Sequence, residues 1–164
     1  MPVLPYDRTA AVNYALRWAL SRNPEYTDFS NLGGDCTNFV SQCVFAGSGV
    51  MNFSPIFGWY YLSSYDRAPA WTGVEFFRNF LINNTGVGPF GSEVPVSEIK
   101  PGDIVQFMSP DSGRFNHTLI VSRIIPGINP VILVCAHTND ARNRPLFTYN
   151  YSDIRFLHIA GVRT

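Results

Sequence analysis

The hydrophobic pattern of this chain changes its period at Pro101-Gly102, and this change restricts the possible folds more than any other feature. Before it, apolar residues recur at helical spacing; after it, short apolar runs end at Pro, Gly, Asn or Asp, as in antiparallel strands. Helices followed by strands predict an α+β fold. No repeat, low-complexity segment or linker interrupts the pattern, so residues 1–164 are predicted to form a single domain.

The element boundaries follow from stop signals in the sequence. Three helices are predicted: Tyr6–Ser21, a helix from Cys36 to a glycine stop at Gly47, and a helix from Thr72 to the segment Asn83–Gly86. The predicted strands are Asp103–Met108, Thr118–Ile125, Val131–His137, Leu146–Tyr151 and Phe156–Val162.

The charge balance argues against two classes of partner. Lys plus Arg equals Asp plus Glu, at 12 each, and no run of one sign occurs, so we expect neither nucleic acid nor an anionic membrane surface as a partner. The longest apolar run, Val131–Ala136, is far too short to cross a bilayer. Met1–Pro5 lacks the basic and apolar regions of a secretion signal, so we expect none in this chain, which is compatible with a module of a longer exported protein.

A cysteine stands at the predicted start of the second helix, directly after Gly33-Gly34. Asp35 is expected to be the N-cap, with its carboxylate accepting the backbone N–H of Asn38. Cys36 then becomes the first helical residue, where the positive end of the helix dipole favours a thiolate over a thiol. We interpret Cys36 as a candidate nucleophile, against the alternative of an ordinary buried cysteine.

The three cysteines give no disulfide framework, because they cannot all pair within the chain. Cys36 and Cys43 lie on one predicted helix, about 10 Å apart along its axis and beyond disulfide reach. Cys43 and Cys135 lie on apolar faces and are expected to be inert core residues.

His117 opens the second predicted strand and His137 closes the third, and these strands are predicted to form a hairpin. Pairing Ile125 with Val131 places His117 opposite Asn139, whereas a neighbouring register places it opposite His137. In both registers the odd-numbered positions share one face of the sheet, so these polar side chains are expected to cluster at one end of it.

Such a cluster suits nucleophilic catalysis, in which a cysteine needs a base and the base needs an orienting group. We predict that Cys36 attacks, that His117 transfers the proton, and that His137 or Asn139 orients His117. His158 lies within a strand and has no partner suggested by spacing, so we interpret it as structural.

The block from Gly33 to Gln42 closely resembles the motif of the putative amidase domain family of bacteria, which is related to the NlpC/P60 and CHAP groups of papain-like cysteine peptidases and amidases. Further segments occur in the family's order: Trp59–Tyr61, the helix after Trp71, Lys100–Phe107, Asn116–Val121 and Ala136–Thr138. The resemblance therefore covers most of the chain.

The resemblance implies a papain-like fold, with N-terminal helices packed on an antiparallel sheet of five to six strands. It also implies hydrolysis of an amide bond through a thioester, with His137 as the third catalytic residue. The oxyanion would be bound by the backbone N–H of Cys36 and by the Asn31 side chain. No cofactor is expected. Peptidoglycan stem peptides or other bacterial amides are the implied substrates, and a secreted or cell-wall location is implied for a longer protein containing this module.

Two alternatives remain open from the sequence. A papain-like domain of this kind could bind cell-wall peptides or a protein partner without cleaving them. A zinc module is the other alternative, with Cys36, Cys43, Cys135 and His137 as ligands, although their spacing departs from that of known zinc sites.

Overall fold

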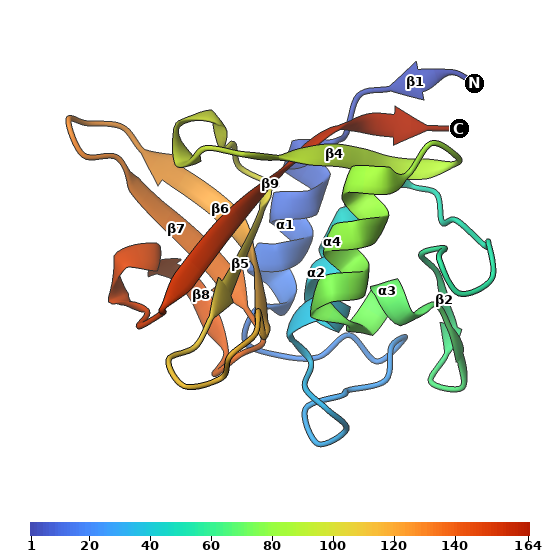
Figure 1. The fold of residues 1–164 in the computed structure, drawn as a ribbon, viewed down its shortest axis with the longest axis horizontal. Helices are drawn as coiled ribbons and strands as arrows, with labels where there is room; N and C mark the ends of the chain where they lie inside the picture. The colour runs from blue at the N-terminus through green and yellow to red at the C-terminus, as the bar shows by residue number, and fades with distance from the viewer.

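The computed structural model describes residues 1–164 and has the predicted α+β architecture, with the helices packed beside a curved sheet (Figure 1). The α-helices are α1 (Arg8–Trp18), α2 (Cys36–Ser48), α3 (Pro69–Thr72) and α4 (Val74–Asn83). Gly73 separates α3 from α4, so the predicted third helix is preceded by an extra turn. None of the four helices has the length and apolar character that a membrane span requires.

Seven strands form the main sheet, in which every pairing is antiparallel. They are β1 (Val3–Leu4), β4 (Gly88–Val94), β5 (Ile104–Met108), β6 (His117–Ile125), β7 (Val131–Ala136), β8 (Ala141–Pro145) and β9 (Asp153–Arg163). The order is β1-β9-β5-β6-β7-β8, and β4 also pairs with β9. A separate hairpin joins β2 (Tyr61–Ser63) to β3 (Asp66–Arg67).

The sheet has seven strands where five to six were predicted, and it differs from the prediction in three places, one of which is the short strand β1 paired with β9. Leu146–Tyr151 is not a strand, because Leu146–Thr148 forms a 3₁₀ turn and the preceding polar segment Ala141–Pro145 pairs with β7 instead. The glycine- and proline-containing segment Gly88–Val94 pairs along β9, although both residue types are depleted in strands.

Helix α2 passes through the predicted glycine stop. Gly47 lies inside the helix, where an added Cβ would be 2.6 Å from the Tyr6 ring and 2.7 Å from the Asp7 carbonyl oxygen. The helix ends at Gly49, which adopts a left-handed conformation with φ 72°. Gly47 therefore allows the close approach of the chain before α1, and Gly49 provides the stop.

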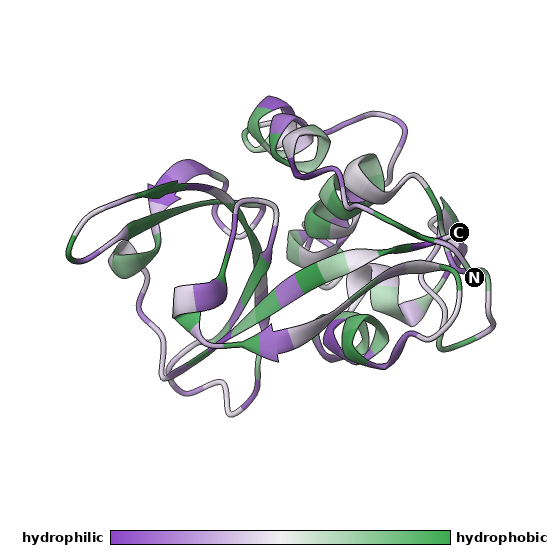
Figure 2. Cartoon of the chain, turned by 90° about the horizontal axis from the view of Figure 1, so that it is seen from above, coloured by the Kyte–Doolittle hydropathy of each residue, from purple (hydrophilic) through white to green (hydrophobic).

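Two apolar clusters lie on opposite faces of the sheet. The larger, between the helices and the sheet, contains Trp59, Trp71 and Phe77, whereas the smaller contains Phe107 and Leu119. Figure 2 shows hydrophobic residues along both the helices and the curved strands. Because β5 and β6 contribute to both clusters, the start of β6 is held from both sides.

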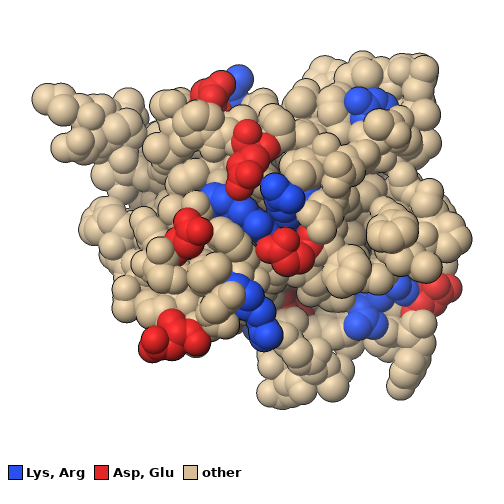
Figure 3. All heavy atoms as spheres, viewed as in Figure 1, with Lys and Arg blue, Asp and Glu red and all other residues tan.

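Asp103 is fully buried and joins α1 to the sheet. Its carboxylate accepts the Lys100 N–H at 2.9 Å, as expected for the Pro-Gly-Asp turn, and also bonds to Arg8 at 2.8 Å. Nδ1 of His158 lies 2.8 Å from the same carboxylate, which gives this histidine a structural partner. On the exposed surface, acidic and basic side chains are interspersed (Figure 3), so the structure shows no extended patch of one sign on that face.

Candidate active site

A β-bulge determines which side chains meet beside His117. Near the turn, β6 and β7 pair as predicted, with Ile125 opposite Val131, but the register shifts by one residue between Val121 and Arg123. Beyond the shift, Ile120 pairs with Cys135. The prediction that all odd-numbered positions share one face is therefore wrong, because a one-residue slip turns every later side chain to the other face.

The shift brings Thr138, rather than His137 or Asn139, to His117. The Oγ1 of Thr138 lies 3.1 Å from Nδ1 of His117. The imidazole ring of His117 also packs on the Phe107 ring, with ring centroids 4.7 Å apart. His117 is half-buried, and burial lowers the pKa of its imidazole below the usual value, which favours the neutral form of the ring at neutral pH.

Cys36 is the first residue of α2, as predicted, and its thiol is free and partly exposed. Its Sγ lies 3.9 Å from the carbonyl oxygen of Asn116, the residue before His117. The two elements are tied together here by a buried contact of 2.8 Å between the hydroxyls of Thr37 and Thr118. Figure 1 shows the start of α2 and the connection between β5 and β6 at the same end of the molecule.

The other two cysteines are fully buried, as expected for inert core residues. Burial raises the pKa of Cys43 well above the usual value and also raises the pKa of Cys135. Cys36 is therefore the one thiol of this chain that solvent can reach.

Asp35 occupies the N-cap position, but its side chain does not accept the backbone N–H of Asn38. Its Oδ1 instead accepts the backbone N–H of Phe29 and the side-chain amide of Asn38, both at 2.8 Å. The carboxylate thus holds the loop before Cys36 in place, where a conventional cap would have held only the helix end.

His137 is buried against Asp35 and is not hydrogen-bonded to His117. Its Nδ1 lies 2.5 Å from Oδ2 of Asp35, and its Nε2 lies 2.7 Å from the carbonyl oxygen of Trp18. The ring also stacks on Phe39 of α2, with centroids 4.0 Å apart. Because both ring nitrogens are occupied, His137 cannot orient His117 in this arrangement.

Arg22, whose role the sequence did not predict, links the loop before Cys36 to the turn after His137. Its guanidinium bonds to both carboxylate oxygens of Asp140, at 2.9 and 3.0 Å, and its Nε lies 3.5 Å from Asp35. It also lies 3.3 Å from Asp28. The sequence around Arg22 does not predict this role, because the acidic partners of Arg22 lie in two different loops.

The remaining predicted site residues stand apart. Asn31 and Asn139 are exposed in turns and make no side-chain hydrogen bond, and Asn139 has a positive φ of 49°. For the zinc alternative, no group of three or more His, Cys, Asp or Glu side chains is arranged to hold a metal ion.

The polar residues after Cys36 in the motif are buried, and each has a partner. Asn38 accepts the Trp71 indole N–H at 3.0 Å, and Ser41 accepts the Trp59 indole N–H at 3.0 Å. Gln42 accepts the Tyr14 hydroxyl at 2.5 Å. These hydrogen bonds hold α2 against its neighbours, so the buried polar residues of the motif have a structural role. The thiol of Cys36 is partly exposed and remains available to react.

The comparison with protein families agrees with this site. The model of the family described as "Putative amidase domain" matches residues 5–160. The chain belongs to this family. The matched region of the amidase domain includes Cys36, His117 and Thr138, so all three lie within it.

Curated relatives of this amidase domain come from Bacillus subtilis (strain 168). The chain is 37% identical over 142 residues to "Uncharacterized protein YhbB", covering 85% of this chain and 43% of the relative. It is 27% identical over 147 residues to "Uncharacterized protein YjcM", covering 85% of this chain and 32% of the relative. The chain thus spans less than half of each relative's length. No solved structure is significantly similar to it.

Proposed function

We propose that this domain hydrolyses amide bonds with Cys36 as the nucleophile and His117 as the general base and acid. The observation that carries the proposal is the position of the partly exposed thiol, whose Sγ lies 3.9 Å from the backbone carbonyl oxygen of Asn116, the residue before the half-buried His117. Membership of the amidase domain family supports the type of bond. A helix N-terminus also lowers the cost of forming a thiolate.

The same placement supports a papain-like arrangement, with the cysteine on a helix N-terminus and the histidine at the start of an antiparallel strand. Cys36 and His117 make no hydrogen bond to each other in the structure, so the imidazole would have to turn towards Sγ to take its proton. In the reaction, His117 takes the Cys36 proton and the thiolate attacks the amide carbonyl. The backbone N–H of Cys36 stabilises the oxyanion, and Asn31 would have to move to add a second donor. His117 then protonates the leaving amine, and water, deprotonated by His117, releases the acid and restores the thiol.

Thr138 replaces His137 as the proposed orienting residue. If Nδ1–H of His117 donates to Oγ1 of Thr138, the opposite nitrogen, Nε2, carries the free electron pair that a base needs. The contact of 3.1 Å between Oγ1 and Nδ1 is short enough for this hydrogen bond. Thr138 acts through His117 and does not need to touch the substrate.

Replacing Thr138 by Val removes this hydroxyl while keeping the shape of the side chain. We expect kcat to fall by about three- to tenfold, the value of one hydrogen bond, while KM changes little. Thr138→Ser should restore kcat, because it restores the acceptor. Steady-state kinetics of the three proteins test the role, and an equal loss in the Val and Ser variants would contradict it.

The dependence of kcat/KM on pH should reflect the protonation of the His117 imidazole. Desolvation lowers the pKa of this imidazole, so the neutral ring that accepts the thiol proton persists below the usual imidazole value of about 6.5. As pH falls through the lowered pKa, the ring becomes protonated and kcat/KM should decline. A profile of kcat/KM against pH that already declines above about pH 6.5 would contradict this account.

Cell-wall peptides are the substrate class that we propose, with the domain acting as a module of a longer secreted or wall-associated protein. Two cavities of about 550 and 600 Å³ include neither Cys36 nor His117 in their linings. A partly exposed thiol that lines neither of these cavities suits an amide carried by a large polymer better than a small amide that must be surrounded.

Digestion of purified peptidoglycan tests this proposal. Wild type is expected to release fragments that mass spectrometry assigns to cleavage of one type of amide bond, and Cys36→Ala should release none. Identical products from the two proteins would exclude cysteine catalysis on this polymer. Retained binding of peptidoglycan by wild type without any cleavage would instead favour the non-catalytic binding domain.

A further inference from the structure

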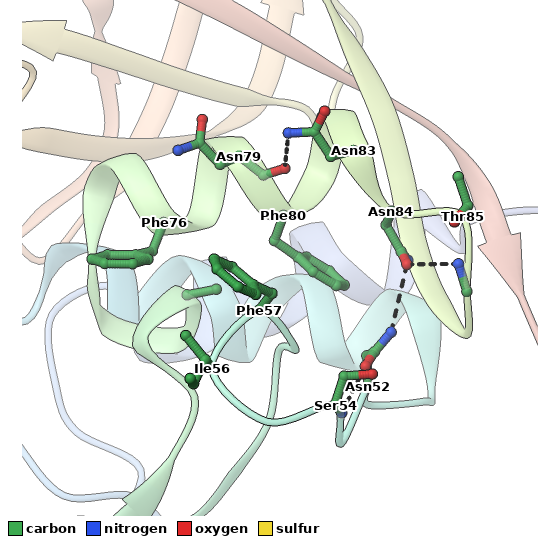
Figure 4. Close-up of a pocket in the computed structure, with 12 residues that line it drawn as sticks. Asn52, Ser54, Ile56, Phe57, Phe76, Asn79, Phe80, Asn83, Asn84 and Thr85 are labelled. Atoms are coloured by element: carbon green, nitrogen blue, oxygen red, sulfur yellow. Dashed lines mark hydrogen bonds between the residues drawn. The ribbon is translucent and has the colours of Figure 1, made fainter.

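A cavity of about 550 Å³ lies between α4 and the loop that follows α2 (Figure 4). This volume falls within the range of small-molecule binding sites. The lining contains four asparagines, three phenylalanines and no charged residue. The full set is Asn52, Ser54, Ile56, Phe57, Ala70, Phe76, Asn79, Phe80, Asn83, Asn84, Thr85 and Gly86.

Two of the three aromatic side chains that line this cavity are open to solvent, whereas Phe80 is buried. Phe57 is 78% exposed and Phe76 is 48% exposed. Figure 4 shows the rings of Phe76, Phe57 and Phe80 in a row along one side of α4. Exposed apolar groups gathered in one place mark binding surfaces, and flat aromatic faces present broad contact area for a ligand.

Two of the asparagines build the cavity wall. The Asn52 amide donates to the Val87 carbonyl oxygen, and the Asn84 amide donates to the Pro89 carbonyl oxygen, each at 2.9 Å. The Oδ1 atoms of both side chains accept backbone N–H groups of nearby residues, also at 2.9 Å. Both amide donors are used, because Asn52 Nδ2 also donates to Asn84 and Asn84 Nδ2 also donates to Val87, so the one site left for a ligand is a second lone pair on Oδ1 of Asn52.

Other polar groups on the lining are free. Nδ2 of Asn79, Oδ1 of Asn83 and the hydroxyls of Ser54 and Thr85 make no hydrogen bond within the protein. Asn79 and Asn83 lie one helical turn apart on α4. The lining therefore offers both donors and acceptors, and all of them are uncharged.

The loop on the other side has a fixed and strained shape. Ile56 adopts a left-handed conformation with φ 66°, which is rare for a β-branched residue. Gly58 has no room for a side chain, because an added Cβ would lie 2.3 Å from the Ser54 carbonyl oxygen. Strain of this kind concentrates at ligand sites, where it holds side chains such as Phe57 in position.

We propose that this cavity binds a neutral saccharide. Aromatic faces contact the C–H surfaces of sugar rings, and uncharged amides and hydroxyls pair with sugar hydroxyls, whereas a charged ligand would find no counter-charge. A second depression of about 430 Å³ adjoins the cavity at Phe76. It is lined by Tyr65, which is 99% exposed, and by Arg67, whose guanidinium already donates to Thr72 and to the Ser64 carbonyl oxygen. The combined surface has room for more than one sugar ring.

The site is separate from the cysteine centre. Cys36 begins α2, and the cavity loop follows the opposite end of this 13-residue helix, about 20 Å away at the usual rise per residue. Saccharide binding therefore does not depend on the reactivity of Cys36, and Cys36→Ser should leave it unchanged.

An NMR titration tests the proposal with two neutral probes, the β-1,4-linked trisaccharides of glucose and of N-acetylglucosamine. At least one is expected to cause saturable amide shifts centred on residues 52–58 and 76–86. Phe57→Ala should weaken its binding about tenfold, in line with the loss of an aromatic contact. Phe147→Ala is the matched control, because Phe147 is 73% exposed but lies outside the cavity, and it should bind as wild type does.

Three results would overturn the proposal. One is the absence of saturable shifts with both trisaccharides up to about 10 mM, which exceeds the usual range of specific sites. Another is an equal loss of binding in Phe57→Ala and Phe147→Ala. The third is tighter binding of a neutral peptide, N-acetyl-alanyl-alanine amide, at the same residues, which would assign the cavity to peptides.

Discussion

Replacing His117 by Ala is expected to lower kcat/KM for amide hydrolysis by about 10²- to 10⁴-fold, the usual contribution of a positioned general base and acid. In the proposed mechanism this imidazole takes the Cys36 proton and returns one to the leaving amine, so its removal abolishes both transfers. The half-buried ring also packs on Phe107, so the variant's thermal unfolding must be measured to show that the fold persists.

His158→Gln is the matched control for this loss. His158 bonds to the buried carboxylate of Asp103, far along the chain from the thiol, and glutamine keeps a donor for that bond. We expect its kcat/KM to stay within a few-fold of wild type. Equal losses in the two histidine variants would indicate a general structural effect and would contradict the assignment of His117 as the base.

Replacing Asp35 by Ala is expected to lower the free energy of unfolding by about 3–5 kcal/mol, the cost of breaking a buried pair from one side. The Asp35 side chain is 1% exposed, and its removal leaves His137 Nδ1 and the backbone N–H of Phe29 buried without their hydrogen-bond partner. Denaturant unfolding should show a lower midpoint with an unchanged slope.

Asp140→Ala provides the comparison for this effect. Asp140 binds Arg22 at 2.9 Å, but its side chain is 33% exposed, so solvent screens the pair. We expect a loss of about 1 kcal/mol or less. If the two variants lost the same stability, burial of the Asp35–His137 pair would not be what holds the loop before Cys36.

The parts of the site that lie in one local segment could be predicted from the sequence. The start of α2 at Cys36 follows from Asp35 and the preceding glycines, and the position of His117 at the start of a strand follows from the periodicity. The hairpin of β6 and β7 was also predicted, including the pairing of Ile125 with Val131.

The third residue could not be predicted, because a single bulged residue decides it. Ser122 lies at the register shift, where its hydroxyl donates to the Leu133 carbonyl oxygen at 3.1 Å and lies 2.7 Å from Asn143. Nothing in the alternation of β6 marks this point. The shift turns His137 towards the helices and Thr138 towards His117, which exchanges their expected roles.

The long-range polar contacts could not be predicted from the sequence for a different reason. Asp35 looks like an ordinary helix cap in sequence, since the capping rule considers only its neighbours. Its partner His137 lies 102 residues away and reaches it only when β7 packs on α2. Several groups compete for this buried carboxylate, and the imidazole of His137, with Nδ1 at 2.5 Å, takes the place that the backbone N–H of Asn38 would have in a conventional cap.

The rate at which iodoacetamide alkylates each cysteine tests the central claim without knowledge of the substrate. Peptide mapping by mass spectrometry should find the label on Cys36 long before Cys43 or Cys135, which are fully buried. In His117→Ala, alkylation of Cys36 near neutral pH should slow, because the thiol has lost its base. Preferential labelling of Cys135, or an unchanged Cys36 rate without His117, would contradict a Cys36–His117 catalytic pair.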